Sequence, residues 1–139
     1  MKKLLLIGLF GLCSAANAAV FEVEMTGPGG HSNGNYGNYG NVNAVHAGAR
    51  AILALEKALP CASAYNFKGG ATVNAIAGDA RFLVNAGVCK EDAAALQEKI
   101  TAAVKQGADE ENAFRSVKAG DLVKGFPAEI RFSVKQVGK

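Results

Sequence analysis

The fold of this chain is decided by the stretch Val23-Glu24-Met25-Thr26-Gly27-Pro28-Gly29-Gly30-His31-Ser32-Asn33. Apolar residues at positions 21, 23 and 25 alternate with glutamates at 22 and 24, and this period of two predicts a strand with one buried face. The Gly-Pro-Gly-Gly sequence predicts a turn at the end of that strand. The segment is therefore predicted to be a strand that presents His31.

A second segment also combines a glycine-rich turn with an alternating strand. Its sequence is Lys68-Gly69-Gly70-Ala71-Thr72-Val73-Asn74-Ala75-Ile76-Ala77-Gly78-Asp79-Ala80-Arg81-Phe82. A glycine pair leads to Asn74, and an alternating strand follows. Glycine permits a tight approach of the backbone in such turns. We expect Gly29, Gly30, Gly69 and Gly70 to permit this approach around a cleft at His31 and Asn74.

In the rest of the chain, the spacing of apolar residues alternates between the period of a helix and the period of a strand. Periodicity predicts helices over 42–59 and 90–106, the first capped by Asn41 or Asn43 and the second ended by Gly107. Further strands are predicted over 62–68, 80–86 and 128–137, whereas 108–125 is polar and poorly periodic. This order predicts an α+β fold of the ferredoxin-like, split βαβ type, a four-stranded antiparallel sheet with both helices on one face. An edge strand of this sheet is left open.

The first predicted helix carries two stripes. The apolar stripe is the expected core face, and the small residues beside it let another helix approach closely or are simply good helix formers. The apolar stripe comprises Val45, Gly48, Ile52, Leu55 and Leu59, and the small stripe comprises Ala47, Ala51, Ala54 and Ala58.

Residues 1–18 have the layout of a secretory signal peptide: Lys2-Lys3, an apolar run over 4–12, and the small-residue site Ala16-Asn17-Ala18. We therefore expect residues 19–139 to be one exported domain, periplasmic or extracellular, with no membrane span in the mature chain. Loss of the two lysines lowers the formal charge from +3 to +1. The remaining charges form no patch of one sign, so nucleic acid is not an expected partner.

Cys61 and Cys89 remain in the mature chain. If 62–68 and 80–86 pair as antiparallel strands, the two cysteines lie together at the open end of that pair. A disulfide that closes a loop of about 29 residues stabilises the folded state by about 3.5 kcal/mol on the chain-entropy model. The alternative is a pair of unrelated buried thiols.

Together, the Gly-His-Ser and Gly-Gly-x-x-x-Asn-x-Ile motifs resemble those of the dimerisation (lid) domain of M20 zinc metallopeptidases and deacylases, over Val20 to Phe132. The resemblance implies a homodimer in which the sheets of two copies join at their edges. It also implies that His31 reaches a partner's active site to stabilise an oxyanion, and that Asn74 contacts substrate. Two departures weaken that substrate site: Asn85-Ala86-Gly87 replaces an Asp-x-Arg pattern, and Ala77 replaces a proline.

The family's hydrolysis needs two zinc ions held by a cluster of His, Asp and Glu ligands. This sequence has two histidines, His31 and His46, and no His-x-Asp motif. It therefore predicts no metal site, no cofactor and no catalysis by this chain alone; zinc would come only with a separate catalytic subunit. His46 is expected on the surface of the first helix or in an interface.

These observations favour an exported, stand-alone dimerisation domain that forms homodimers. Three alternatives stay open. The chain is a small-molecule or peptide-binding protein that keeps the cleft around His31 and Asn74, a lid subunit for a separately encoded M20-type zinc hydrolase, or a truncated remnant. The Asn-Tyr-Gly repeat over 32–41 is expected to be an exposed loop.

Overall fold

The sheet has the strand order β3-β5-β1-β8, and all neighbouring strands in it are antiparallel. Its strands are β1 (Val20–Thr26), β3 (Ser63–Gly69), β5 (Asp79–Asn85) and β8 (Arg131–Gly138). The computed structural model describes residues 19–31 and 41–138. The predicted signal peptide and residues 32–40 of the predicted loop over 32–41 lie outside the described residues; Asn41, the last residue of that loop, is buried rather than exposed.

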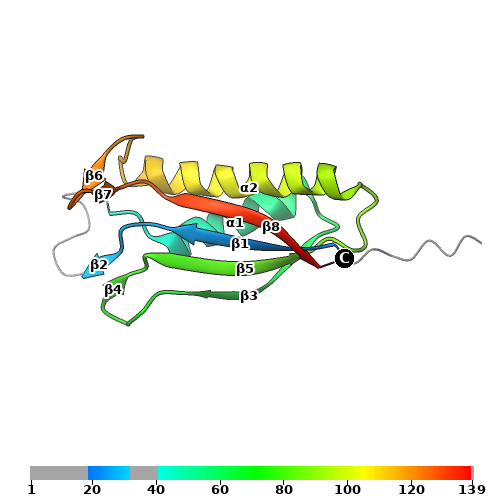
Figure 1. The fold of residues 1–139 in the computed structure, drawn as a ribbon, viewed down its shortest axis with the longest axis horizontal. Coiled ribbons are helices and arrows are strands. Elements are labelled where there is room, and N and C mark those ends of the chain that lie inside the picture. The colour runs from blue at the N-terminus through cyan, green and yellow to red at the C-terminus, as the bar shows by residue number, and fades with distance from the viewer. Residues whose placement is uncertain (1–18, 32–40, 139) are drawn as a thin grey trace, which may run out of the picture.

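Two helices, α1 (Ala44–Ala58) and α2 (Ala93–Phe114), lie side by side on one face of this sheet (Figure 1). The predicted split βαβ arrangement is therefore confirmed. Two short strand pairs are added at one end: β2 (Gly30–His31) with β4 (Ala75–Ile76), and β6 (Leu122–Val123) with β7 (Phe126–Pro127). Among the residues described, no helix is both long and apolar enough to cross a membrane.

The alternation of β1 places its apolar side chains under the helices. Phe21, Val23 and Met25 are fully buried there, and β5 contributes Phe82 and Val84 to the same layer. Glutamates 22 and 24 point to the other face of the sheet, as the two-residue period requires. The core is thus a single layer between the sheet and the two helices.

The predicted end of the second helix at Gly107 is wrong, because α2 runs on to Phe114. Gly107 instead lies where the two helices cross: a Cβ atom added to it would lie 2.6 Å from Ala51 Cα and 2.8 Å from the Ala47 carbonyl oxygen. Only a residue without a side chain fits there. Of the two readings of the small stripe, close approach of another helix therefore applies, and that helix is α2 of the same chain.

Side chains cap both helices. Asn43 Oδ1 accepts hydrogen bonds from the backbone N–H groups of Val45 and His46, so it is the N-cap of α1. Asp92 Oδ1 accepts from the Ala95 N–H and is the N-cap of α2. The sequence placed Asp92 inside the first turn, whereas the helix begins one residue after it.

Glu111 joins the end of α2 to the start of α1. Its side chain is completely buried, yet every hydrogen bond to it is charge-assisted: Arg50 Nε donates to Oε2 at 3.2 Å, Arg115 Nε to Oε1 at 3.1 Å, and the Asn43 N–H to Oε1 at 3.0 Å. A buried carboxylate is tolerated only with such partners. Glu111 therefore fixes where α1 begins.

We expect Glu111→Ala to lower the free energy of unfolding by about 3–5 kcal/mol, because it leaves two arginines without their buried counter-ion. Urea denaturation followed by circular dichroism measures this change. Glu110→Ala removes an exposed carboxylate from the neighbouring position and should change the same quantity by less than about 0.5 kcal/mol. Equal effects of the two substitutions would contradict the role given to Glu111.

Candidate functional site

The two glycine-rich segments meet at one end of the sheet. Strand β2 pairs antiparallel with β4, which sets Gly30 opposite Ile76 and His31 opposite Ala75. The side chains of His31 and Asn74, 43 positions apart in the sequence, then come within 3.4 Å, from Asn74 Nδ2 to His31 Nε2. The structure thus brings together the two residues singled out from the sequence, and both are exposed.

Thr72 sets the orientation of the Asn74 amide. Its hydroxyl donates a hydrogen bond of 2.9 Å to Asn74 Oδ1, which turns the Nδ2 group toward His31. Because an amide nitrogen only donates, His31 Nε2 accepts, and the proton of the neutral imidazole lies on Nδ1. The pair therefore presents N–H donors, which suit a carboxylate or an oxyanion.

Glycine is required at several positions around this pair. Gly29, Gly30 and Gly70 have positive φ angles of 63°, 138° and 80°, a region that other residues rarely adopt. At Gly69 the constraint is space, since an added Cβ would lie 2.5 Å from the Asp79 carbonyl oxygen. Each of the four predicted cleft glycines therefore has a local backbone reason to be glycine.

A cavity of about 660 Å³ opens beside His31, between the Gly-Pro-Gly-Gly turn and the β6–β7 hairpin. It is lined by Pro28, Gly29, Gly30, His31, Asn41, Leu122, Val123, Lys124 and Phe126. Asn74 is not among these residues. His31 therefore borders two features, the contact with Asn74 and this cavity.

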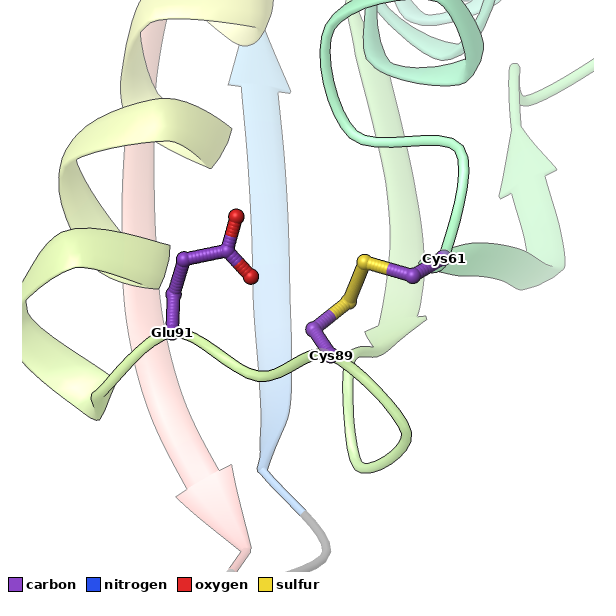
Figure 2. Close-up of side chains that lie close together, drawn as sticks. All are labelled: Cys61, Cys89 and Glu91. Carbon is purple, nitrogen blue, oxygen red and sulfur yellow. A yellow bond between two sulfur atoms is a disulfide. The ribbon is translucent and has the colours of Figure 1, made fainter.

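At the opposite end of α1, the predicted disulfide is present between Cys61 and Cys89 (Figure 2). The two sulfur atoms and the Glu91 carboxylate lie within 4.8 Å of one another, and no other such group of three potential metal ligands occurs among the described residues. As a disulfide the sulfurs are not thiolates, which is the form that binds metals. Lys99 donates to the Glu91 carboxylate at 2.7 Å. We therefore regard the cluster as structural.

Two charged groups outside the site have displaced pKa values. A hydrogen bond from Lys99 lowers the pKa of Glu91, so this ion pair stabilises the fold above the ordinary carboxyl pKa and is lost as the pH falls through the lowered value. A hydrogen bond to Glu22, on the face of the sheet away from the helices, raises the pKa of Arg81.

Sequence reasoning missed most of the surroundings of this site. Asn41 was considered only as a helix cap and as the end of an exposed loop, and β6 and the turn of the β6–β7 hairpin fell in the segment read as poorly periodic. Lys124 and Gly125 have φ angles of 50° and 81°, which is the geometry of a type I′ hairpin turn. A two-residue turn between apolar pairs was the available signal. His46 is exposed on α1, as expected.

The family model for the peptidase dimerisation domain, M20_dimer, matches residues 13–112. The chain therefore belongs to the M20 dimerisation-domain family, as the two motifs indicated. That domain is distinct from the catalytic domain of these hydrolases. No protein among the curated sequences matches the chain.

Solved structures with the same fold include proteins titled as a dipeptidase and as an amidase, and the chain spans about a quarter of each. Aminoacylhistidine dipeptidase from Vibrio alginolyticus matches with a TM-score of 0.62 and 19% identity over 89% of this chain and 22% of that one. An amidase of the hydantoinase/carbamoylase family from Burkholderia multivorans matches with a TM-score of 0.55 and 18% identity, over 87% of this chain and 27% of that one. At these identities the likeness shows the fold alone.

We expect neutral His31 to carry its proton on Nδ1. Long-range ¹H–¹⁵N NMR spectra recorded above the histidine titration should show Nε2 as the unprotonated nitrogen, because Asn74 donates to it. Asn74→Leu removes the donor and should move the population toward the Nε2–H tautomer. His46 is the internal control and should not change. An Nε2–H tautomer in the unmodified protein would contradict the assigned hydrogen bond.

Proposed function

We propose that this chain is an exported dimerisation module that pairs with a second copy through the β3 edge and the side of α1 above it, and that has no catalytic activity of its own. The observation that carries the proposal is the unequal character of the two sheet edges. Strand β3 pairs only with β5, and β8 only with β1, among the described residues. The two edges differ in the charge of their side chains and in how far neighbouring groups cover them.

The β8 edge is poorly suited to self-association. It carries Arg131 and Lys135, and antiparallel pairing of two copies about Ser133 would set these cations opposite each other, which is destabilising. Helix α2 also packs along β8, where the Gln97 side chain donates a hydrogen bond of 2.8 Å to the Val134 carbonyl. The two cations and the Gln97 side chain therefore protect this edge from pairing with another strand.

The β3 edge is uncharged from Ser63 to Phe67. Phe67 of β3 is 40% exposed, and Leu53 of α1, the helix that contacts β3, is 58% exposed, although both side chains are large and apolar. A hollow of about 290 Å³ lies between α1 and β3, bordered by Ile52, Pro60 and Ala64 among others. A second copy would cover these apolar groups and add a strand to the sheet.

A bulge at Asn66, whose φ is 54°, interrupts the pairing of β3 between Tyr65 and Lys68. Bulges on edge strands limit uncontrolled pairing. Backbone pairing with a second copy is therefore restricted to short segments on either side of Asn66. The apolar side chains beside the edge must supply most of the association energy.

We expect sedimentation equilibrium of the oxidised protein to show a dimer, and Leu53→Asp to weaken it by about tenfold or more, because it places an unpaired carboxylate on a surface that the second copy would cover. Val137→Asp is the matched control, since Val137 is 50% exposed on the β8 edge. It should leave the dissociation constant unchanged. A monomer at all concentrations, or equal effects of both substitutions, would contradict the proposed interface.

The contact between His31 and Asn74 favours a second candidate function, a lid for a separately encoded zinc hydrolase. In that assembly the partner would supply the zinc ions and the nucleophile, and the exposed His31 would donate a hydrogen bond to its reacting oxygen. The experiment is pull-down with the mature protein from its natural source, followed by assay of a co-purifying zinc amidohydrolase. His31→Ala should lower the kcat of that enzyme about 10²-fold without disrupting the complex. Absence of such an enzyme from the purified material rejects this function.

A further inference from the structure

A residue that lines the cavity between the Gly-Pro-Gly-Gly turn and the β6–β7 hairpin carries a buried hydrogen-bond acceptor that no described residue satisfies. Asn41 is 4% exposed and lines the cavity. Its Oδ1 atom is the one buried side-chain oxygen or nitrogen, within residues 19–31 and 41–138, that lacks a hydrogen-bond partner. Buried polar atoms of folded proteins are nearly always paired, and the exceptions call for a ligand or a water.

The acceptor is held in place by its neighbours along the chain. Val42 is fully buried and Asn43 caps α1, where its backbone N–H donates to Glu111. Two hydrogen bonds between Asn43 Oδ1 and the first turn of α1 fix the same segment. Asn41 thus lies two residues before the N-cap of a helix whose first turn is held by hydrogen bonds, and preformed placement of this kind is how binding sites orient their polar groups.

The opposite wall of the cavity is apolar with one cation. Phe126 and Leu122 are 68% and 66% exposed, and they face the cavity together with Val123. Lys124 lies in the tight turn of the hairpin and also lines the cavity. His31 is the second titratable group at the rim. An apolar surface, a cation and a buried acceptor thus border one space of about 660 Å³, a size typical of small-molecule sites.

We propose that this cavity binds a small aromatic carboxylate that carries a phenolic O–H or an aryl N–H. The donor pairs with Asn41 Oδ1, the carboxylate pairs with Lys124, and the ring covers Phe126 and Leu122. An aliphatic acid without a donor would leave the Asn41 oxygen unpaired, and a neutral phenol would leave Lys124 without an anion. This binding differs from the proposed self-association, because neither the β3 edge nor Leu53 takes part in it.

The test compares two probes that differ in one hydrogen-bond donor, 4-hydroxyphenylacetate and phenylacetate. Binding to the full-length mature protein is followed by NMR titration up to about 10 mM, a range that captures millimolar dissociation constants. We expect saturable shifts at His31, Lys124 and Phe126. Phenylacetate should bind about five- to tenfold more weakly, the value of one buried hydrogen bond.

Substitutions then assign each contact. Asn41→Leu should remove the difference between the two probes, whereas Lys124→Met should weaken both by about fivefold and reduce the dependence on salt. Lys57→Met is the matched control, because Lys57 is an exposed lysine in the last turn of α1, at the other end from Asn41. It should change neither affinity.

Equal affinities for the two probes in the unmodified protein would overturn the proposal and indicate that Asn41 Oδ1 holds only a water. Absence of saturable binding by both probes would overturn it as well. If Asn41→Leu does not fold, the comparison of the two probes and the Lys124→Met variant still decide. Sedimentation of the same samples separates a failure of binding from a failure of dimerisation.

Discussion

A buried carboxylate on α2 determines how the functional end of this protein is arranged. Glu111 accepts hydrogen bonds from Arg50, Arg115 and the backbone of Asn43, so the C-terminal part of one helix fixes the first residue of the other. The start of α1 in turn fixes Asn41 beside the cavity. Cation–π contacts of both arginines with Phe114, at 5.1 and 4.9 Å from the ring centroid, cover the same junction. The position of the site therefore depends on an interaction between helices rather than on the loops alone.

The surface that suits self-association and the candidate site lie in different parts of the molecule. Residues that suit self-association lie along β3 and the adjacent side of α1, while His31, Asn74 and the cavity lie at the end that carries β2, β4 and the β6–β7 hairpin (Figure 1). The unequal edges of the sheet would give the proposed assembly a direction, because β3 combines exposed apolar groups with an uncharged run from Ser63 to Phe67. A dimer that formed through β3 would leave the His31–Asn74 contact and the cavity of each copy open to solvent.

Much of the fold was predictable because alternation and helical period are local signals. The strands around His31 and Asn74, the cap at Asn43 and the pairing of Cys61 with Cys89 followed from such signals. Gly107 did not, because glycine ends helices and also allows helices to cross, and only the three-dimensional contact with Ala51 distinguishes the two. Glu111 could not be identified either, since an acid in a polar run normally faces solvent. The adjacency of His31 and Asn74 was indicated by the family resemblance, and Asn41 by nothing in the sequence.

The disulfide lies at the end of the helix pair opposite Glu111. Cys61 follows the last turn of α1 and Cys89 precedes the first turn of α2 (Figure 2). The antiparallel helices are thus fastened at both ends, covalently at one and electrostatically at the other. Local opening of the helices, as amide hydrogen exchange detects it, is then opposed at each end by a different kind of bond. A reducing agent would admit exchange from the cysteine end and would leave the hydrogen bonds of Glu111 at the other end in place.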